Sequence, residues 1–253
     1  MGKQYRKYGI IVCCLVLLGL LLFNTYYFFI RREVGPLYYV HKLFYLPKDN
    51  ILQRTIYQDL SEEYAYLNKR LIGKKHIVFV GDSITKGFNF QEYFPNHTII
   101  NRGIFSDTTF GLLKRLDRNV VNLYADKIFL MIGYNDLEYR TNGEILRNIA
   151  DILKQFKTET VYVQSLLSVD ATLVSINARI VEINKGIKAL CKRHSYVYIN
   201  LHSHFSNDKG GINRAYSRDG VHPNGSGYLL WSKLVAPFII QKIGRGSGQT
   251  NND

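Results

Sequence analysis

The strongest constraint on the fold of this chain is the alternation of short apolar runs with helix-like stretches between residues 74 and 243. The runs are apolar on successive residues, which is typical of strands buried on both faces of a parallel sheet. The helix-like stretches are long enough for right-handed crossovers. Strands are expected at 76–80, 98–100, 127–132, 160–164 and 196–199, and helices at 107–122, 142–157, 173–193 and 226–242. The pattern predicts a three-layer α/β/α (flavodoxin-like) domain with about five parallel strands.

The N-terminal segment has no charged residue from Tyr8 to Ile30. At about 1.5 Å per residue, such a run can cross a bilayer core of about 30 Å. A cleaved signal peptide would have a shorter apolar core followed by small residues, whereas bulky aromatic residues follow here. We therefore expect an uncleaved transmembrane helix at 9–30 after a short tail at 1–8. Flanking basic residues are nearly balanced, but a short tail, one span and a large following domain favour an extracytoplasmic domain.

The connector at 31–73 is rich in Tyr and Leu, and its second half has an amphipathic helical pattern. This helix could lie on the membrane or pack on the domain. A structural role is favoured because it carries no grouping of reactive side chains. The polar tail at 244–253 is expected to be disordered.

The charge balance is basic, with 33 Lys and Arg against 20 Asp and Glu and a formal net charge of +13. This favours anionic surroundings such as phospholipid head groups or acidic polymers. The chain has neither a long basic run nor a nucleic-acid-binding module. We therefore expect a solvated basic surface near a membrane and no nucleic-acid partner.

The cysteines and paired histidines give little support for redox or metal chemistry. Cys13 and Cys14 fall in the apolar N-terminal run, which leaves Cys191 without a disulfide partner in the domain. Cys191 lies in a helix-like stretch, where a small buried residue is commoner than a nucleophile. His202 and His204 have no third ligand at a suitable spacing for zinc. No metal and no organic cofactor are expected.

Polar side chains gather where the expected strands end and just before the last helix. In an open parallel sheet, ligands bind beyond the carboxyl ends of the strands, so these residues are candidates for chemistry. The groups are Gly81-Asp82-Ser83-Ile84-Thr85, Asn101-Arg102-Gly103, Gly133-Tyr134-Asn135-Asp136 and Asp219-Gly220-Val221-His222-Pro223-Asn224.

These four groups resemble, in order, the sequence blocks of the SGNH (GDSL) hydrolase family, over residues 76–240. Within that family the chain is most similar to platelet-activating-factor acetylhydrolase-like and carbohydrate acetylesterase members. That similarity lies in Asn101-Arg-Gly-Ile104, Asp107-Thr-Thr109 and Leu112-Leu-Lys-Arg-Leu-Asp117.

The resemblance implies specific roles for five residues. Ser83 would be the nucleophile, and Asp219 and His222 would be its acid-base pair. The backbone amides of Ser83 and Gly103 and the side chain of Asn135 would form the oxyanion hole.

The chemistry of ester cleavage asks for the same residue types. A serine hydroxyl is a poor nucleophile until a base removes its proton, and imidazole can do so near neutral pH. A carboxylate bonded to the other ring nitrogen fixes the tautomer and stabilises the imidazolium. Asp219 and His222 lie in a turn that Gly220 can tighten. Ser83 is not in a Gly-x-Ser-x-Gly elbow, which argues against a lipase of the α/β-hydrolase type.

The candidate residues also have structural alternatives. Asp82 or Ser83 could cap a helix after an ordinary strand-to-helix turn. Asp82 is expected to be a hydrogen-bond acceptor rather than a second base. Asn135 and Asp136 could bond only their own turn, which is favoured for Asp136. Gly103 could serve only for its backbone conformation.

The sequence therefore predicts a membrane-anchored serine esterase that removes a small acyl group, above all O-acetyl, from a glycan or lipid through an acyl-serine intermediate. An O-acetyltransferase would form the same acyl-enzyme and pass the group to a sugar hydroxyl. A non-catalytic glycan-binding domain would keep the fold, but it has no need of Ser83, Asn135, Asp219 and His222 together.

Overall fold

The computed structural model describes residues 55–71, 76–158 and 160–240. The predicted transmembrane helix at 9–30, the tails at 1–8 and 244–253 and the first part of the connector lie outside these residues. Within the described ranges, no helix combines the length and the apolar character needed to span a bilayer.

Five parallel strands form one sheet in the order β2-β1-β3-β4-β5, which confirms the predicted strand type and number. Their bounds are Ile77–Gly81 for β1, Ile99–Gly103 for β2, Lys127–Met131 for β3, Thr160–Gln164 for β4 and Val197–Ile199 for β5. Gly81 at the end of β1 pairs with Gly103 on one side and with Met131 on the other. The carboxyl ends of these three strands therefore meet at one edge.

Strand β2 runs through Gly103, further than residue 100 where the sequence pattern predicts its end. Its polar residues are tolerated because they find partners at the edge of the sheet. The side-chain amide of Asn101 donates to three backbone carbonyls of the segment after β1, at 2.8 to 3.2 Å. Polar character in this strand therefore reflects a tertiary contact and does not mark a loop.

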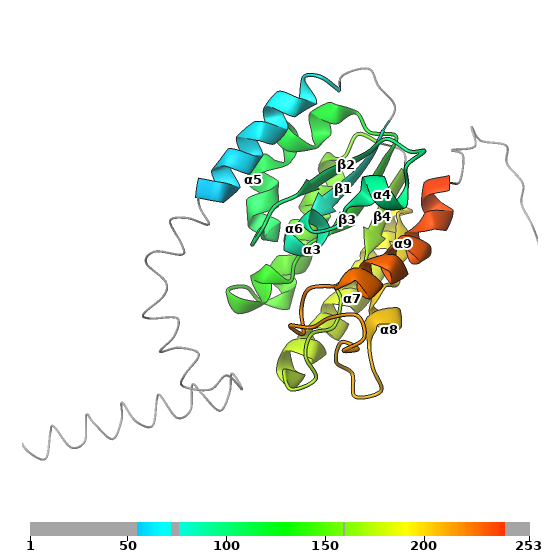
Figure 1. Cartoon of the computed structure of the whole chain (residues 1–253). Coiled ribbons are helices and arrows are strands. Elements are labelled where there is room, and N and C mark those ends of the chain that lie inside the picture. Colours follow the sequence, from blue (N-terminus) through cyan, green and yellow to red (C-terminus); the bar gives the residue numbers. More distant parts are fainter. Residues whose placement is uncertain (1–54, 72–75, 159, 241–253) are drawn as a thin grey trace, which may run out of the picture. The chain divides into compact units, whose positions relative to one another are not determined.

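Helices cover both faces of the sheet. The long helices are α5 (Thr109–Asn119), α6 (Asn142–Gln155), α7 (Val174–His194) and α9 (Gly225–Ile240). The short ones are α3 (Ser83–Lys86), α4 (Phe90–Tyr93), α8 (His202–Phe205) and the 3-10 turns η1 (Val121–Leu123) and η2 (Asn135–Glu138). Helices α5, α6 and α7 pack in succession on one face, and α9 with α4 lies on the other (Figure 1). The three-layer architecture is the predicted one.

Stacked aromatic rings join neighbouring strands in the core. The ring of Phe79 in β1 lies parallel to that of Phe129 in β3, with centroids 4.4 Å apart, and Phe129 stacks on Tyr162 of β4 at 4.5 Å. Trp231 of α9 is fully buried and donates its indole N–H to Gln164 at the end of β4. The contact of Trp231 with Gln164 holds α9, and with it the turn that precedes it, against the sheet.

The amphipathic part of the connector forms a helix at 55–68 that packs on the domain, one of the two placements that the sequence allows. The hydroxyl of Tyr57 donates to Gly111 O at 2.9 Å, and Ser61 Oγ donates to Asn119 Oδ1 at 2.9 Å. Both partners lie in α5. The helix therefore extends the layer that covers this side of the sheet.

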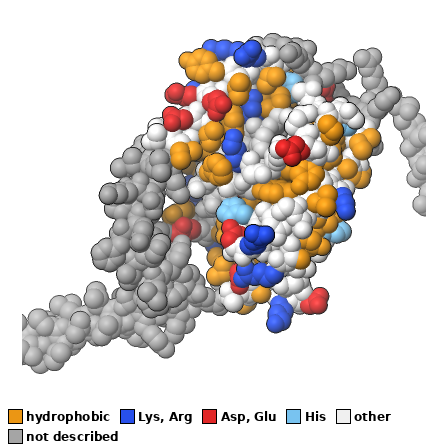
Figure 2. All heavy atoms as spheres, viewed as in Figure 1, with side chains coloured by type: hydrophobic (Ala, Val, Ile, Leu, Met, Phe, Trp, Pro, Cys, Tyr) orange, Lys and Arg blue, Asp and Glu red, His pale blue; other side chains and the backbone are white. Residues whose placement is uncertain are grey.

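Basic side chains are spread over the molecular surface in the view of Figure 2. On that face, Lys and Arg side chains are interspersed with acidic and hydrophobic ones. The basic side chains of the described residues are thus not gathered into one patch on the face shown.

Candidate active site

The side chains of Ser83, His222 and Asp219 form a connected line at the carboxyl edge of the sheet. Ser83 is the first residue of α3, shortly after the end of β1. Its Oγ lies 3.0 Å from His222 Nε2, and His222 Nδ1 lies 2.7 Å from Asp219 Oδ2. The fold thus brings together the three residues that the sequence singles out for nucleophilic and acid-base chemistry.

The turn between β1 and α3 holds Ser83 in place. Asp82 is the N-cap of α3, and its Oδ1 accepts the backbone amide hydrogen of Ile84 at 3.0 Å. The Asp82 side chain is buried, and this burial raises its pKa to about 7. Asp82 is thus a hydrogen-bond acceptor within the turn, as the sequence predicts.

Asp219 and His222 share a tight turn before α9. One carboxylate oxygen of Asp219 accepts the backbone amide hydrogens of Val221 and His222, at 2.9 and 2.8 Å. Gly220 has a φ of +84°, a left-handed conformation that glycine adopts without strain. The turn therefore presents the other carboxylate oxygen to the imidazole ring.

Hydrogen bonding keeps Asp219 ionised. Partial burial raises its pKa, but hydrogen bonds from the His222 ring and from the amides of Val221 and His222 outweigh this effect. The pKa of Asp219 therefore lies well below its usual range. The side chains of His222 and Asp219 are 48% and 56% exposed, so solvent reaches both. The ionised carboxylate can stabilise an imidazolium whenever His222 takes up a proton.

Asn135 reaches from η2 to the loop after β2. Its side-chain amide donates to the backbone carbonyl of Asp107 at 2.9 Å, so it does not bond only its own turn. A carboxamide has two N–H donors. The bond to Asp107 therefore orients the group and leaves one donor for a substrate.

Gly103 does not have the geometry that its predicted oxyanion role requires. Its backbone amide donates to Asn101 Oδ1 at 2.9 Å, so this donor is already engaged. A Cβ atom at Gly103 would lie 2.4 Å from Lys86 N and 2.9 Å from Asp82 O. Glycine is needed here because β2 packs directly against the turn that carries Ser83.

Ser106, in the loop after β2, is a residue that sequence analysis does not reveal. Its φ is +58°, a left-handed conformation that is uncommon for residues other than glycine. Ser106 is exposed, and it directly precedes Asp107, whose carbonyl accepts the Asn135 side chain. Nothing in the sequence around Ser106 predicts this left-handed conformation, because the surrounding fold imposes it.

The sequence also does not predict a buried ion pair between Arg115 and Asp107. Arg115 Nη2 lies 2.7 Å from Asp107 Oδ2, and the two side chains are 2% and 0% exposed. The same nitrogen donates to Arg102 O at 2.9 Å and to Gly81 O at 3.3 Å, which joins the ends of β2 and β1. Burial raises the pKa of Asp107 to about 6, although Arg115 acts in the opposite direction.

Asp136 has a structural role that differs in detail from the predicted one. Its carboxylate accepts the Thr109 amide hydrogen at 2.7 Å and the Thr109 hydroxyl hydrogen at 2.6 Å. Arg140 lies 3.2 Å from the same carboxylate. Desolvation raises the pKa of Asp136, against these hydrogen bonds. The residue therefore ties η2 to the start of α5 as well as to its own turn.

In the described part of the chain, the other residues considered for chemistry make no hydrogen bond to Ser83, His222 or Asp219. Cys191 is buried, and burial raises the pKa of its thiol to about 11. His202 and His204 lie in α8, where His202 Nδ1 is 3.4 Å from Ser206 Oγ. Among the described residues, no group of His, Cys, Asp and Glu side chains is arranged to hold a metal ion.

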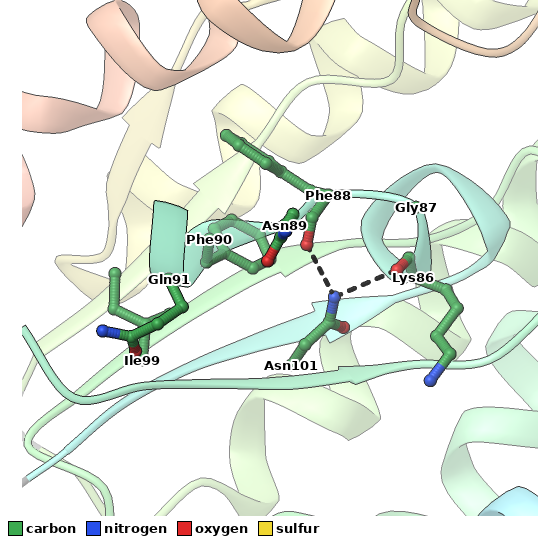
Figure 3. A pocket seen from close by; sticks show the side chains of 8 residues that line it. All are labelled: Lys86, Gly87, Phe88, Asn89, Phe90, Gln91, Ile99 and Asn101. Carbon is green, nitrogen blue, oxygen red and sulfur yellow. Dashed lines mark hydrogen bonds between the residues drawn. The ribbon is translucent and has the colours of Figure 1, made fainter. Parts of the chain in front are cut away.

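Figure 3 shows a pocket of about 320 Å³ beside β2 and the segment between α3 and α4. The side chain of Asn101 lies in its wall and donates to the carbonyls of Lys86 and Phe88. Ser83 and His222 do not line this pocket. The pocket is therefore lined by other residues than the Ser83, His222 and Asp219 site.

Comparisons with known proteins bear on the same residues. A family model described as GDSL-like Lipase/Acylhydrolase family matches residues 79–230. A solved structure described provisionally as a platelet activating factor from Streptococcus pneumonia has 25% identity and a TM-score of 0.72, over 78% of this chain and 99% of that one. An acylhydrolase from Bacteroides fragilis, also described provisionally, has 25% identity and a TM-score of 0.63, over 70% and 94%.

A third similar structure is a catalytic mutant of an acetylxylan esterase from Geobacillus stearothermophilus. It has 18% identity and a TM-score of 0.57, over 69% of this chain and 98% of that one. At this identity the likeness is one of fold alone. No curated protein matches the chain.

Proposed function

The chain belongs to the GDSL-like lipase/acylhydrolase family and is a serine ester hydrolase of the SGNH type, and we propose that it removes a small acyl group, above all O-acetyl, from a glycan or lipid at a membrane surface. The proposal rests on two contacts. Ser83 Oγ lies 3.0 Å from His222 Nε2, and His222 Nδ1 lies 2.7 Å from Asp219 Oδ2. Both contacts are within hydrogen-bond range without any rearrangement.

Ser83 is the proposed nucleophile. Its Oγ forms a bond to the acyl carbon while His222 Nε2 takes the hydroxyl proton. Asp219 orients the ring and stabilises the imidazolium. The tetrahedral intermediate collapses when the ester C–O bond breaks and the imidazolium gives its proton to the leaving alcohol. Water then attacks acyl-Ser83 with His222 again as the base, which releases the carboxylic acid and restores the serine hydroxyl.

The proposed oxyanion donors are the backbone amides of Ser83 and Ser106 and the second amide hydrogen of Asn135. Ser106 takes the place of Gly103, because the Gly103 amide is already hydrogen-bonded. The left-handed backbone of Ser106 and the bond from Asn135 to the neighbouring Asp107 carbonyl support this assignment. Each well-aimed donor contributes about 3 to 4 kcal/mol to transition-state stabilisation.

The exposure of the acid-base pair supports hydrolysis over acyl transfer. His222 and Asp219 are about half exposed, so water can reach the acyl-enzyme, whereas a transferase has to keep water out. The test is an assay with an acetylated donor, with and without a sugar acceptor. Acetate release at a rate independent of the acceptor is expected. Acceptor-dependent product with negligible free acetate would establish a transferase instead.

The proposed location is the outer surface of a membrane, with the chain as a single-pass protein. The apolar segment at 9–30 and the net charge of +13 support it, since a basic domain held at a bilayer favours anionic glycans and head groups. The protein should stay with washed membranes, and protease added to intact cells should degrade the domain. A domain that survives until the membrane is opened would lie on the cytoplasmic side.

A serine-reactive fluorophosphonate tests the site itself. Peptide mapping of the labelled protein should place the adduct on Ser83, and His222→Ala should prevent labelling. Absence of an adduct under conditions that label a control esterase would contradict the mechanism.

A further inference from the structure

Tyr64, in the helix at 55–68, joins two segments of the active site through one hydroxyl group. The hydroxyl donates to Gly103 O at 2.7 Å and accepts a hydrogen from Lys86 Nζ at 3.1 Å. Gly103 ends strand β2, which leads into the loop of the proposed oxyanion donor. Lys86 is the last residue of α3, the helix that Ser83 begins. The hydroxyl therefore lies between the nucleophile's helix and the oxyanion loop.

Burial and a neighbouring guanidinium group hold the Tyr64 ring in place. Tyr64 is only 3% exposed, and the Arg102 guanidinium lies 4.6 Å from the centre of its ring. Arg102 also donates to Asn68 Oδ1 at 3.1 and 2.6 Å, one turn further along the same helix. Because packing and charge hold the ring, the hydroxyl is preorganised at the junction.

Strand β2 and helix α3 lie in direct contact at this junction. A Cβ atom at Gly103 would already come within 2.4 Å of Lys86 N, so β2 and α3 touch through their backbones. The Tyr64 hydroxyl bonds the backbone carbonyl of Gly103 on one side of this contact and the side-chain ammonium of Lys86 on the other. A displacement of about 1 Å between reacting groups can lower a rate by about 100-fold, so even a partial loosening at this point has a measurable effect.

We propose that Tyr64 is a positioning residue of the esterase site, whose hydroxyl sets the separation of the Ser83 helix and the oxyanion loop. The helix at 55–68 lies ahead of residues 79–230, which the family model matches. The working hydrolase therefore includes a segment of the connector. The inference rests on the proposed roles of Ser83 and of the loop after β2.

Tyr64→Phe tests the inference, because it removes the hydroxyl and keeps the ring against Arg102. In the full chain, kcat for an acetyl ester is expected to fall about 5- to 30-fold, which is less than the loss expected for a full 1 Å displacement. KM should stay within about twofold of the wild-type value. The rate of fluorophosphonate labelling at Ser83 should fall by a similar factor. All assays are run below the melting temperature of each variant.

Two control variants separate positioning from stability. Tyr196→Phe removes a hydroxyl that donates to Leu153 O at 3.3 Å, just before β5, away from the carboxyl edge of the sheet. Ser61→Ala removes the hydrogen bond from Ser61 Oγ to Asn119 and so loosens the packing of the same helix. Both controls should keep kcat within about twofold, whatever their effect on melting temperature, because neither side chain bonds α3 or the end of β2.

The outcomes are distinguishable. A wild-type kcat in Tyr64→Phe, or an equal loss in all three variants, would overturn the positioning role. Ser83→Ala is assayed alongside them, and if it keeps wild-type activity, the proposed site fails independently of Tyr64. An inactive Ser83→Ala with a selective kcat loss in Tyr64→Phe supports both.

Discussion

His222 Nε2 lies 3.0 Å from Ser83 Oγ, although 139 positions separate the two residues in the chain. The turn before α9 carries the ring, and the β1–α3 turn carries the hydroxyl. Tyr228 of α9 donates its hydroxyl hydrogen to Ile84 O in α3 at 3.0 Å, and Trp231 of the same helix donates to Gln164. The packing of α9 against α3 and the sheet therefore holds the two atoms within reach of each other.

Ser83→Ala should lower kcat/KM by about 10⁴ to 10⁶ while the melting temperature stays close to that of wild type. The hydroxyl has His222 as its partner, and the loss of this single exposed bond costs little stability. Steady-state kinetics and thermal unfolding of the same preparation check both parts. A loss of less than about tenfold would place the chemistry on another residue.

Gly103→Ala should destabilise the protein by about 1 to 3 kcal/mol, because the added methyl group has to displace backbone. It would meet Lys86 N at 2.4 Å and Asp82 O at 2.9 Å, neither of which is the end of a flexible side chain. Gly225→Ala is the matched control, since a Cβ there has no neighbour within 4 Å. Urea unfolding should show a loss for Gly103→Ala alone, and equal midpoints for the two variants would disprove the tight contact.

Arg115→Met should be strongly destabilising, by about 3 to 5 kcal/mol, because it leaves the buried Asp107 carboxylate without its partner. Combining it with Asp107→Asn removes the stranded charge, so the double variant should recover part of this loss. A double-mutant cycle by chemical denaturation measures the coupling. Additive effects of the two substitutions would show that the 2.7 Å ion pair contributes nothing of its own.

The fold and the acid-base turn could be predicted from sequence because local patterns determine them. The runs that became β1, β3 and β4 are apolar on successive residues, and such runs are stable only when buried on both faces. Asp219 and His222 interact across three positions, and Gly220 supplies the backbone conformation that their turn requires. Their geometry depends on few residues outside the turn.

The oxyanion loop could not be predicted in the same way, since partners far away in the chain shape it. Asn101 looks like a loop residue, but its side-chain amide donates to Thr85 O in α3 and its Oδ1 accepts the Gly103 amide hydrogen. The left-handed backbone of Ser106 has no local signature. The spacing of Tyr64 from Tyr57 and Leu60 places it on the apolar face of the helix, unlike the exposed Tyr66, but this spacing does not predict its hydrogen bonds to Gly103 and Lys86.

Asp82→Asn should change how stability depends on pH. Burial raises the pKa of Asp82 to about 7, whereas the unfolded chain releases this proton near pH 4. Between these values the folded protein binds more protons than the unfolded chain, so the free energy of unfolding falls as the pH rises. The contribution of Asp82 to this fall is about 1.4 kcal/mol per pH unit, and hence about 2 to 3 kcal/mol from pH 5 to pH 7.

The asparagine variant keeps an oxygen that can accept the Ile84 amide hydrogen, so it removes the titration without removing the cap. Its free energy of unfolding should therefore fall less steeply between pH 5 and pH 7 than that of wild type, as urea titrations at several pH values would measure. Asp117→Asn, at an exposed position on α5, is the control and should leave the slope unchanged. If Asp82→Asn and wild type show the same slope, Asp82 is ionised throughout this range. The turn that carries Ser83 would then have to hold a buried negative charge at neutral pH.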